Sequence, residues 1–142
     1  MLFIIELAIS SELPDFRLIP VFLWGEDHSF DSDGDSYNPA SRNWTWLHMH
    51  SRELANTPFE IEQSENDLSM YIIRSDNKEI CSRIAFFLST ETNGKILSQD
   101  GQWNHPNYIM NDLGSDFNLA FALERSSKSC IRKSTLENPY PC

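Results

Sequence analysis

The chain has 142 residues, 40% hydrophobic and 12% aromatic, which is typical of one folded domain and excludes a wholly disordered chain. Its formal net charge of −10 argues against a general nucleic-acid-binding protein, because phosphate binding depends on Lys and Arg. The acidic charge favours a basic partner; the alternative is that it only keeps the domain soluble.

The charge is unevenly distributed along the chain. Residues 1–124 contain 20 acidic and 7 basic residues, whereas residues 125–142 contain 4 basic residues and 1 acidic residue. We therefore predict a single acidic domain over 1–124. The Ser-rich basic segment 125–142 is expected to be a loosely ordered tail, or to fold back onto the acidic surface.

The first residues and the cysteines both bear on localisation. Residues 2–9 alternate in the manner of a β-strand, and Glu6 interrupts an apolar run that is too short to span a bilayer. Cys81, Cys130 and Cys142 are odd in number and form no CxxC pair, so no disulfide framework is expected. These features together predict a cytoplasmic protein.

A second apolar run and a long polar loop follow. Residues 16–24 are predicted to form a strand, with Pro20 marking an edge or a bulge and arguing against a helix. Residues 25–43 are rich in Gly, Asp, Ser and Asn and are predicted to form a long loop. Five acidic residues occur in this loop before any basic residue: Glu26, Asp27, Asp31, Asp33 and Asp35.

Residues 44–50 have the composition of a β-strand. Because side chains alternate between the two faces of a strand, one face would carry two tryptophans and two histidines. These residues are Trp44, Trp46, His48 and His50.

A β-hairpin and the main helix are predicted next. Residues 58–74 alternate, turn and alternate again, which is typical of a hairpin. Residues of about 77–92 carry one apolar stripe with helical spacing, preceded by Asp76 as a cap and Glu79 as its capping-box partner. Gly94 is expected to end the helix in a left-handed conformation.

The remaining elements complete the predicted fold. Residues 95–97 are expected to form a short strand, and Asp100-Gly101 a tight turn. Residues 117–123 alternate as a strand would, although a helix also fits this pattern. The predicted class is α+β, with five or six mostly antiparallel strands packed on one main helix.

Few residues indicate catalysis. His48 and His50 could share a metal with His28, His105 or a loop carboxylate, but ordinary surface histidines are the more common case. The run Asp31–Asp35 departs from the EF-hand spacing, and no nucleophile elbow or phosphate-binding glycine loop is present. We expect no cofactor and no enzymatic activity; a small metal-dependent enzyme that uses the two histidines is the alternative.

Three tryptophans flank the acidic loop, namely Trp24 on one side and Trp44 and Trp46 on the other. Aromatic side chains beside carboxylates can anchor a Lys- or Arg-rich protein through burial and cation–π contact. The predicted binding surface therefore comprises the acidic residues of the loop together with these tryptophans. Core packing is the competing explanation for each tryptophan.

The segment Arg83–Trp103 combines a helix, a Gly stop, a short strand and an Asp-Gly turn. In this respect the chain resembles the small acidic immunity proteins with which bacteria neutralise their own secreted toxins. The resemblance implies binding to a basic toxin domain, often a nuclease, and occlusion of its active surface. It transfers no functional residue, and a non-inhibitory adaptor subunit is a further alternative.

Overall fold

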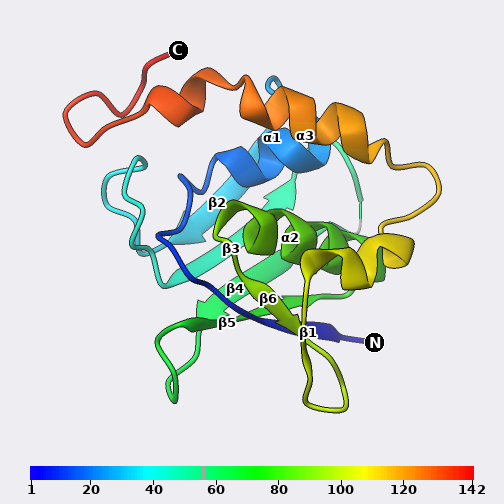
Figure 1. The fold of residues 1–142 in the computed structure, drawn as a ribbon. Coiled ribbons are helices and arrows are strands. Elements are labelled where there is room, and N and C mark those ends of the chain that lie inside the picture. The colour runs from blue at the N-terminus through cyan, green and yellow to red at the C-terminus, as the bar shows by residue number, and fades with distance from the viewer. Residues whose placement is uncertain (56) are drawn as a thin grey trace.

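The computed structural model describes residues 1–55 and 57–142, which form one seven-stranded antiparallel sheet with helices packed over one face (Figure 1). The strands are β1 (Phe3–Ala8), β2 (Phe30–Gly34), β3 (Trp46–Ser51), β4 (Phe59–Gln63), β5 (Met70–Ser75), β6 (Lys95–Leu97) and β7 (Trp103–Asn104). The α-helices are α1 (Leu18–Trp24), α2 (Lys78–Glu91) and α3 (Leu119–Ser127), and the 3-10 helices are η1 (Pro106–Asp112) and η2 (Cys130–Lys133). This arrangement confirms the predicted α+β class.

The strand order β2-β3-β4-β5-β1-β6-β7 places the first strand inside the sheet, between β5 and β6. The predicted hairpin is present as β4 and β5, with Ile61 opposite Ile73. Alternate residues of these strands are buried under the helices. The helical stripe predicted in α2 is buried too, and each such side chain stabilises the fold by about 1.5–3 kcal/mol.

Residues 16–24 contain a helix, so the strand predicted there is wrong. Pro20 is the third residue of α1 and lies in its first turn. Backbone N–H groups in the first helical turn have no partner within the helix, so a proline there removes no hydrogen bond. The six residues Leu18–Leu23 are all buried, which explains why the segment shows no amphipathic period.

Two further segments differ from the prediction. Residues 30–34 of the expected loop form β2, which pairs with β3 at the edge of the sheet. Residues 117–123, predicted as a strand, lead into α3, which begins after Asn118. The Asn118 side chain accepts a hydrogen bond from the Phe121 backbone at 3.0 Å, so a local cap selects the helix over the alternating pattern.

Both ends of α2 are one residue away from the predicted positions. Asn77, rather than Asp76, is the N-cap, and its side chain accepts a hydrogen bond from the Ile80 backbone at 3.1 Å. At the other end Asn93 takes the left-handed conformation, with φ of 51°. Gly94 is required for a different reason, because a Cβ there would lie 2.1 Å from the Ala8 carbonyl oxygen.

The C-terminal segment packs on the domain, and the predicted boundary at residue 124 falls inside α3. The Arg125 guanidinium donates hydrogen bonds to the Val21 and Phe22 carbonyls at 2.8 and 2.6 Å. The fully buried Asp15 carboxylate accepts a hydrogen bond from Ser134 at 2.7 Å. Residues 125–142 are therefore part of the domain and do not form a separate loose tail.

Cys130 and Cys142 form a disulfide, and Cys81 is free and buried. The sequence predicted no disulfide framework, but one disulfide is present, so the cysteines no longer argue for a reducing compartment. Burial raises the pKa of the Cys81 thiol to about 12, so this cysteine stays protonated at neutral pH. None of the helices in the described residues is long and apolar enough to cross a bilayer.

Candidate protein-binding surface

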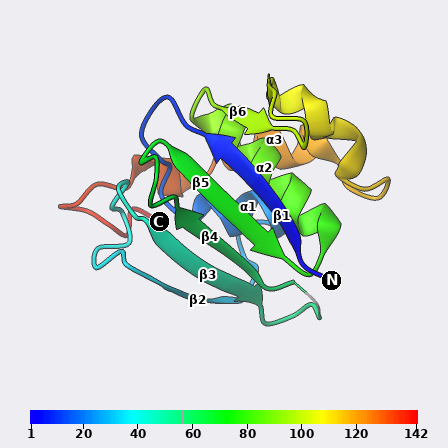
Figure 2. The same ribbon diagram turned by 90° about the horizontal axis from the view of Figure 1, so that it is seen from below.

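The second face of the sheet is not covered by helices. Several of the residues singled out from sequence lie on it, namely Asp31, Asp33, Trp46, His48 and His50. Figure 2 views the molecule from this side, with the strands in front and the helices behind them. We call this surface the open face and define it by the outward residues of five strands. They are Ile4 and Glu6 of β1, Asp31 and Asp33 of β2, Trp46, His48 and His50 of β3, Glu60 and Glu62 of β4, and Ile72 and Arg74 of β5.

The strand register arranges part of the open face as a row of alternating aromatic, acidic and aliphatic side chains. Trp46 lies opposite Glu62, Glu62 lies opposite Ile72, and Ile72 lies opposite Glu6. Neighbouring strands are about 4.8 Å apart, so this row is roughly 14 Å long. A row of this composition can contact both the charged ends and the aliphatic stems of Lys and Arg side chains.

A second row crosses the four strands β2, β3, β4 and β5 and contains an internal ion pair. Asp33 lies opposite His48, His48 opposite Glu60, and Glu60 opposite Arg74. Glu60 accepts hydrogen bonds from the Arg74 guanidinium at 3.2 Å and from the Trp46 indole nitrogen at 3.1 Å. Glu60 of the second row therefore holds the Trp46 ring of the first row in place.

The β2 edge of the open face is also internally paired. The Asp31 carboxylate forms an ion pair with the Arg52 guanidinium and lies 3.1 Å from His50 Nε2. The hydrogen bond from Arg52 is the main reason that the pKa of Asp31 lies below its usual value. Asp31 is therefore ionised at neutral pH, but its charge is largely balanced by Arg52.

Three carboxylates of the open face remain unbalanced. Asp33, Glu62 and Glu6 form no ion pair with any side chain in the part of the chain that the structure describes. Over the whole open face five carboxylates accompany one guanidinium, that of Arg74. The surface consequently has a negative potential that an approaching basic protein would sense.

Asp35 follows β2 and has a structural function. Its carboxylate accepts hydrogen bonds from the Thr45 and Trp46 backbone N–H groups at 2.9 and 3.2 Å, and from the Thr45 hydroxyl at 2.5 Å. Burial raises the pKa of Asp35, but these hydrogen bonds together outweigh that effect and leave it below the usual value. Asp35 therefore anchors the start of β3 instead of offering a free charge.

Four other predicted residues lie away from the open face. Trp44 is buried in the core, where its indole nitrogen donates to the Pro14 carbonyl at 3.0 Å, so it is not available to a partner. Trp24 is half-buried at the end of α1 and stacks on His28 with 4.8 Å between ring centroids. Glu26 and Asp27 are exposed on the turn between these two rings. The acidic loop and the tryptophans are therefore not one surface.

His48 and His50, the pair predicted as possible metal ligands, share the open face but lack a complete ligand set among the described residues. The rings of His48 and His50 are 6.5 Å apart, and His50 is engaged by Asp31. His28 lies elsewhere and contacts Ser51 Oγ at 2.5 Å. Within the residues described, no group of three or more His, Cys, Asp or Glu side chains has the geometry of a metal site.

Several residues of the open face were not identified from sequence. Glu60 and Glu62 lie at the polar positions of the predicted hairpin, so its alternation already predicted that they share one face. What the chain order did not show is that β1 lies next to β5, which adds Ile4 and Glu6 to the surface. The pairing of distant strands therefore determined the extent of the site.

Comparisons of the chain with protein-family models, with curated proteins and with solved structures found no match.

Proposed function

We propose that this protein binds a basic protein through the open face and that it acts as an immunity protein, which neutralises a toxin by occluding its active surface. The observation that carries the proposal is an uncovered sheet face with unbalanced carboxylates and partly exposed apolar side chains. Charge complementarity selects a Lys- or Arg-rich partner. Such a partner could be a nuclease, because nucleases need basic surfaces to bind phosphate.

The composition of the open face supports binding in two stages. Asp33, Glu62 and Glu6 attract the partner over a distance of about a Debye length, which raises the rate of encounter. Trp46 and Ile72 then lose water-exposed apolar surface on contact, which slows dissociation. The rigid sheet keeps these groups in register, so little ordering is needed when the partner binds.

The experiment compares two forms of the protein as bait in extracts of its source organism. In the first form Asp33→Lys and Glu62→Lys reverse two unbalanced charges of the open face. In the matched control Glu12→Lys and Glu137→Lys reverse two exposed charges outside it. We expect the natural protein and the control to capture the same basic protein, and the open-face variant to bind it at least about tenfold more slowly at low salt.

The measured quantities are the association rate at several salt concentrations and the activity of the captured protein. The difference between the two variants should shrink as salt rises, because screening acts on the charges that steer encounter. The inhibitor role requires that binding abolishes the partner's activity. A partner that stays fully active in the complex would identify an adaptor, and equal rates for both variants would reject the open face as the interface.

A further inference from the structure

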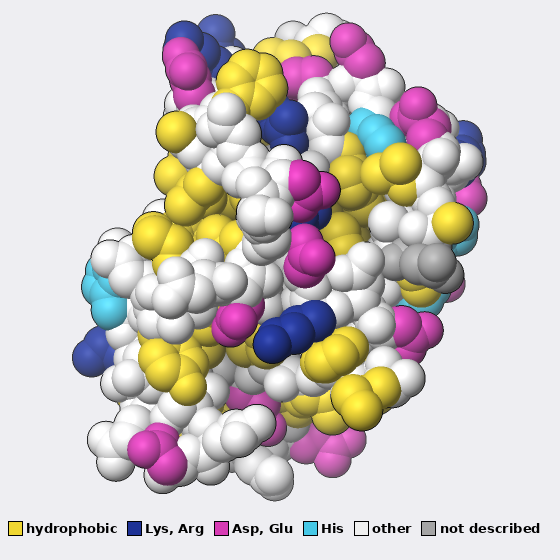
Figure 3. Space-filling model, turned by 90° about the vertical axis from the view of Figure 1, so that its right-hand side faces the viewer, with side chains coloured by type: hydrophobic (Ala, Val, Ile, Leu, Met, Phe, Trp, Pro, Cys, Tyr) yellow, Lys and Arg dark blue, Asp and Glu magenta, His cyan; other side chains and the backbone are white. Residues whose placement is uncertain are grey.

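A cleft of about 670 Å³ lies on the helical side of the molecule, separate from the open face. It opens at the end where α2 and α3 begin, the side that Figure 3 presents to the viewer. There, hydrophobic side chains gather between acidic and histidine side chains. The cleft brings together the end of α1, the segment before β4, the first turns of α2 and the start of α3. Its volume is in the range of small-molecule sites.

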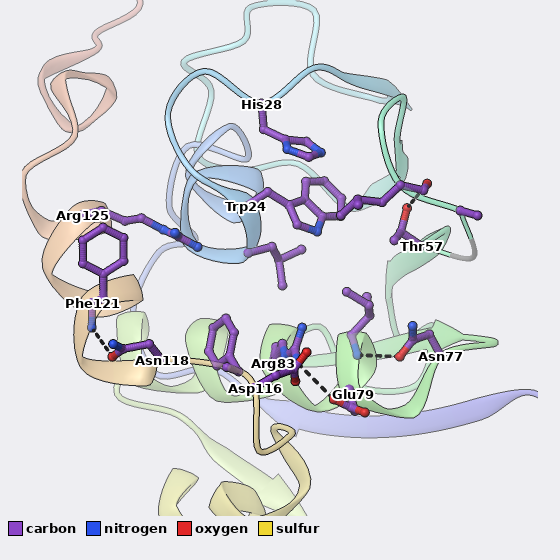
Figure 4. A pocket seen from close by; sticks show the side chains of 15 residues that line it. Trp24, His28, Thr57, Asn77, Glu79, Arg83, Asp116, Asn118, Phe121 and Arg125 are labelled. Atoms are coloured by element: carbon purple, nitrogen blue, oxygen red, sulfur yellow. Dashed lines mark hydrogen bonds and ion pairs between the residues drawn. The ribbon is translucent and has the colours of Figure 1, made fainter.

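Aromatic and aliphatic side chains form much of the cleft wall. Trp24 and Phe121 come from different sides of the cleft (Figure 4), and Phe117 and Ile80 of α2 also line it. Phe121 is 57% exposed, whereas its neighbour Ala122 on the same helix is buried. Three rings around one hollow favour a flat aromatic ligand, since ring stacking adds to the free energy gained from burial.

The two guanidinium groups of the cleft already have partners. Arg83 donates to the Leu113 carbonyl at 2.7 Å, pairs with Glu79 at 3.0 Å, and lies 4.4 Å from the centre of the Phe117 ring. Arg125 is held by carbonyl groups of α1. Because these cations are balanced or already bonded, the cleft does not select a strongly charged ligand.

One polar atom of the cleft lacks a partner among the residues that the structure describes. The Trp24 indole nitrogen is buried and forms no hydrogen bond with any of these residues, and Figure 4 shows it directed across the cleft toward α2. A buried donor without an acceptor destabilises the protein, and a ligand that supplies the acceptor removes this cost. The Trp24 ring cannot easily turn away, because it stacks on His28, which Ser51 and Glu53 hold. A ligand would reach this donor after small side-chain movements, which are common on binding.

We infer that this cleft binds a neutral heteroaromatic small molecule whose ring acceptor receives the hydrogen bond of Trp24 Nε1. The aromatic walls stack on the ligand, the cleft volume limits the size of the ligand, and the unpaired donor requires that the ligand carry an acceptor. This site is independent of the proposed protein partner. It is on the helical side of the sheet, so both ligands can bind to one molecule.

The test compares two bicyclic probes of similar size with the natural protein at pH 7. Quinoline has a ring-nitrogen acceptor, whereas indole has a donor and no ring acceptor. Titrations are followed by NMR through the methyl signals of Ile80 and the indole N–H signal of Trp24. We expect quinoline to shift both signals and to bind several-fold more tightly than indole, because only quinoline satisfies the donor.

Two variants extend the test. Trp24→Phe keeps an aromatic wall and removes the donor, so quinoline affinity measured at Ile80 should fall about three- to tenfold. Trp103→Phe, at an exposed ring outside the cleft, should leave it unchanged. Equal affinities of quinoline and indole for the natural protein, or no shift at Ile80 with quinoline, would overturn the inference. The comparison of quinoline with indole uses only the natural protein, so its outcome does not depend on whether a variant folds.

Discussion

The two faces of the sheet are made from the same strands but have opposite properties. On the inner face, Leu47, Met49, Ile61 and Ile73 are buried beneath the helices. On the open face, the intervening positions carry carboxylates, histidines and single apolar residues. The inner face contributes most of the stability, whereas the open face is free to vary in chemistry without unfolding the domain. This difference is the physical basis for proposing that the open face binds a partner.

The sharpest test of this comparison uses two adjacent isoleucines of β5. Ile73 is fully buried, and Ile72 is its neighbour on the open face. Ile73→Ala should lower the free energy of unfolding by about 2–5 kcal/mol, because it removes buried apolar atoms and leaves a cavity. Ile72→Ala should lower it by about 1 kcal/mol or less. Urea unfolding of both variants measures the difference.

The two variants control for each other, because they make the same substitution in the same strand. Their effects on partner binding should be reversed, with Ile72→Ala weakening the complex and Ile73→Ala acting only through stability. Equal losses of stability would mean that the two faces are not energetically distinct.

A smaller effect is expected at Asp35, on the rim of the open face. Its lowered pKa means that its hydrogen bonds to residues 45 and 46 stabilise the fold at pH values above the ordinary Asp pKa of 3.8. This stabilisation is lost as the pH falls through the lower folded value. Asp35→Asn should therefore destabilise the protein by about 1 kcal/mol or less near pH 7, and this destabilisation should shrink as the pH falls below 3.8.

Asp33→Asn is the matched control, because it removes the same charge from β2 without breaking those hydrogen bonds. Thermal unfolding at several pH values compares the two variants. A destabilisation by Asp35→Asn that stays constant down to pH 2 would contradict the assigned structural function of this carboxylate.

The elements that sequence predicted well are those in which local pattern and tertiary packing agree. The β4–β5 hairpin alternates because one of its faces is buried, and α2 has a single apolar stripe because it covers that face. In contrast, α1 is buried on every side of Leu18–Leu23 and has no period to detect. The strand predicted from Phe117 is a helix because one Asn118 hydrogen bond outweighs a short alternation.

The residues predicted for a binding surface lie only partly on the open face. Asp31, Asp33 and Trp46 are close together in the chain and lie on the paired strands β2 and β3. His48 and His50, predicted only as possible metal ligands, lie on the same face of β3. Long-range strand pairing adds further residues from β1 and β5, and sequence order alone does not specify such pairing. Trp44 and Trp46 are two residues apart, so alternation predicted that they share one face. In the structure β3 begins at Trp46, and Trp44, which precedes the strand, is buried in the core.

The most direct test of the central claim uses the four tryptophans as positional reporters. Trp46 lies on the open face, Trp24 in the cleft, Trp44 in the core and Trp103 on β7. The protein is titrated with a ten-residue polylysine peptide at low salt, and the four indole N–H signals are followed by NMR. We predict that the Trp46 signal shifts most and that this shift is lost when Asp33→Lys and Glu62→Lys are combined. A shift confined to Trp24 or Trp103, with Trp46 unchanged, would contradict the assignment of the open face as the basic-partner surface.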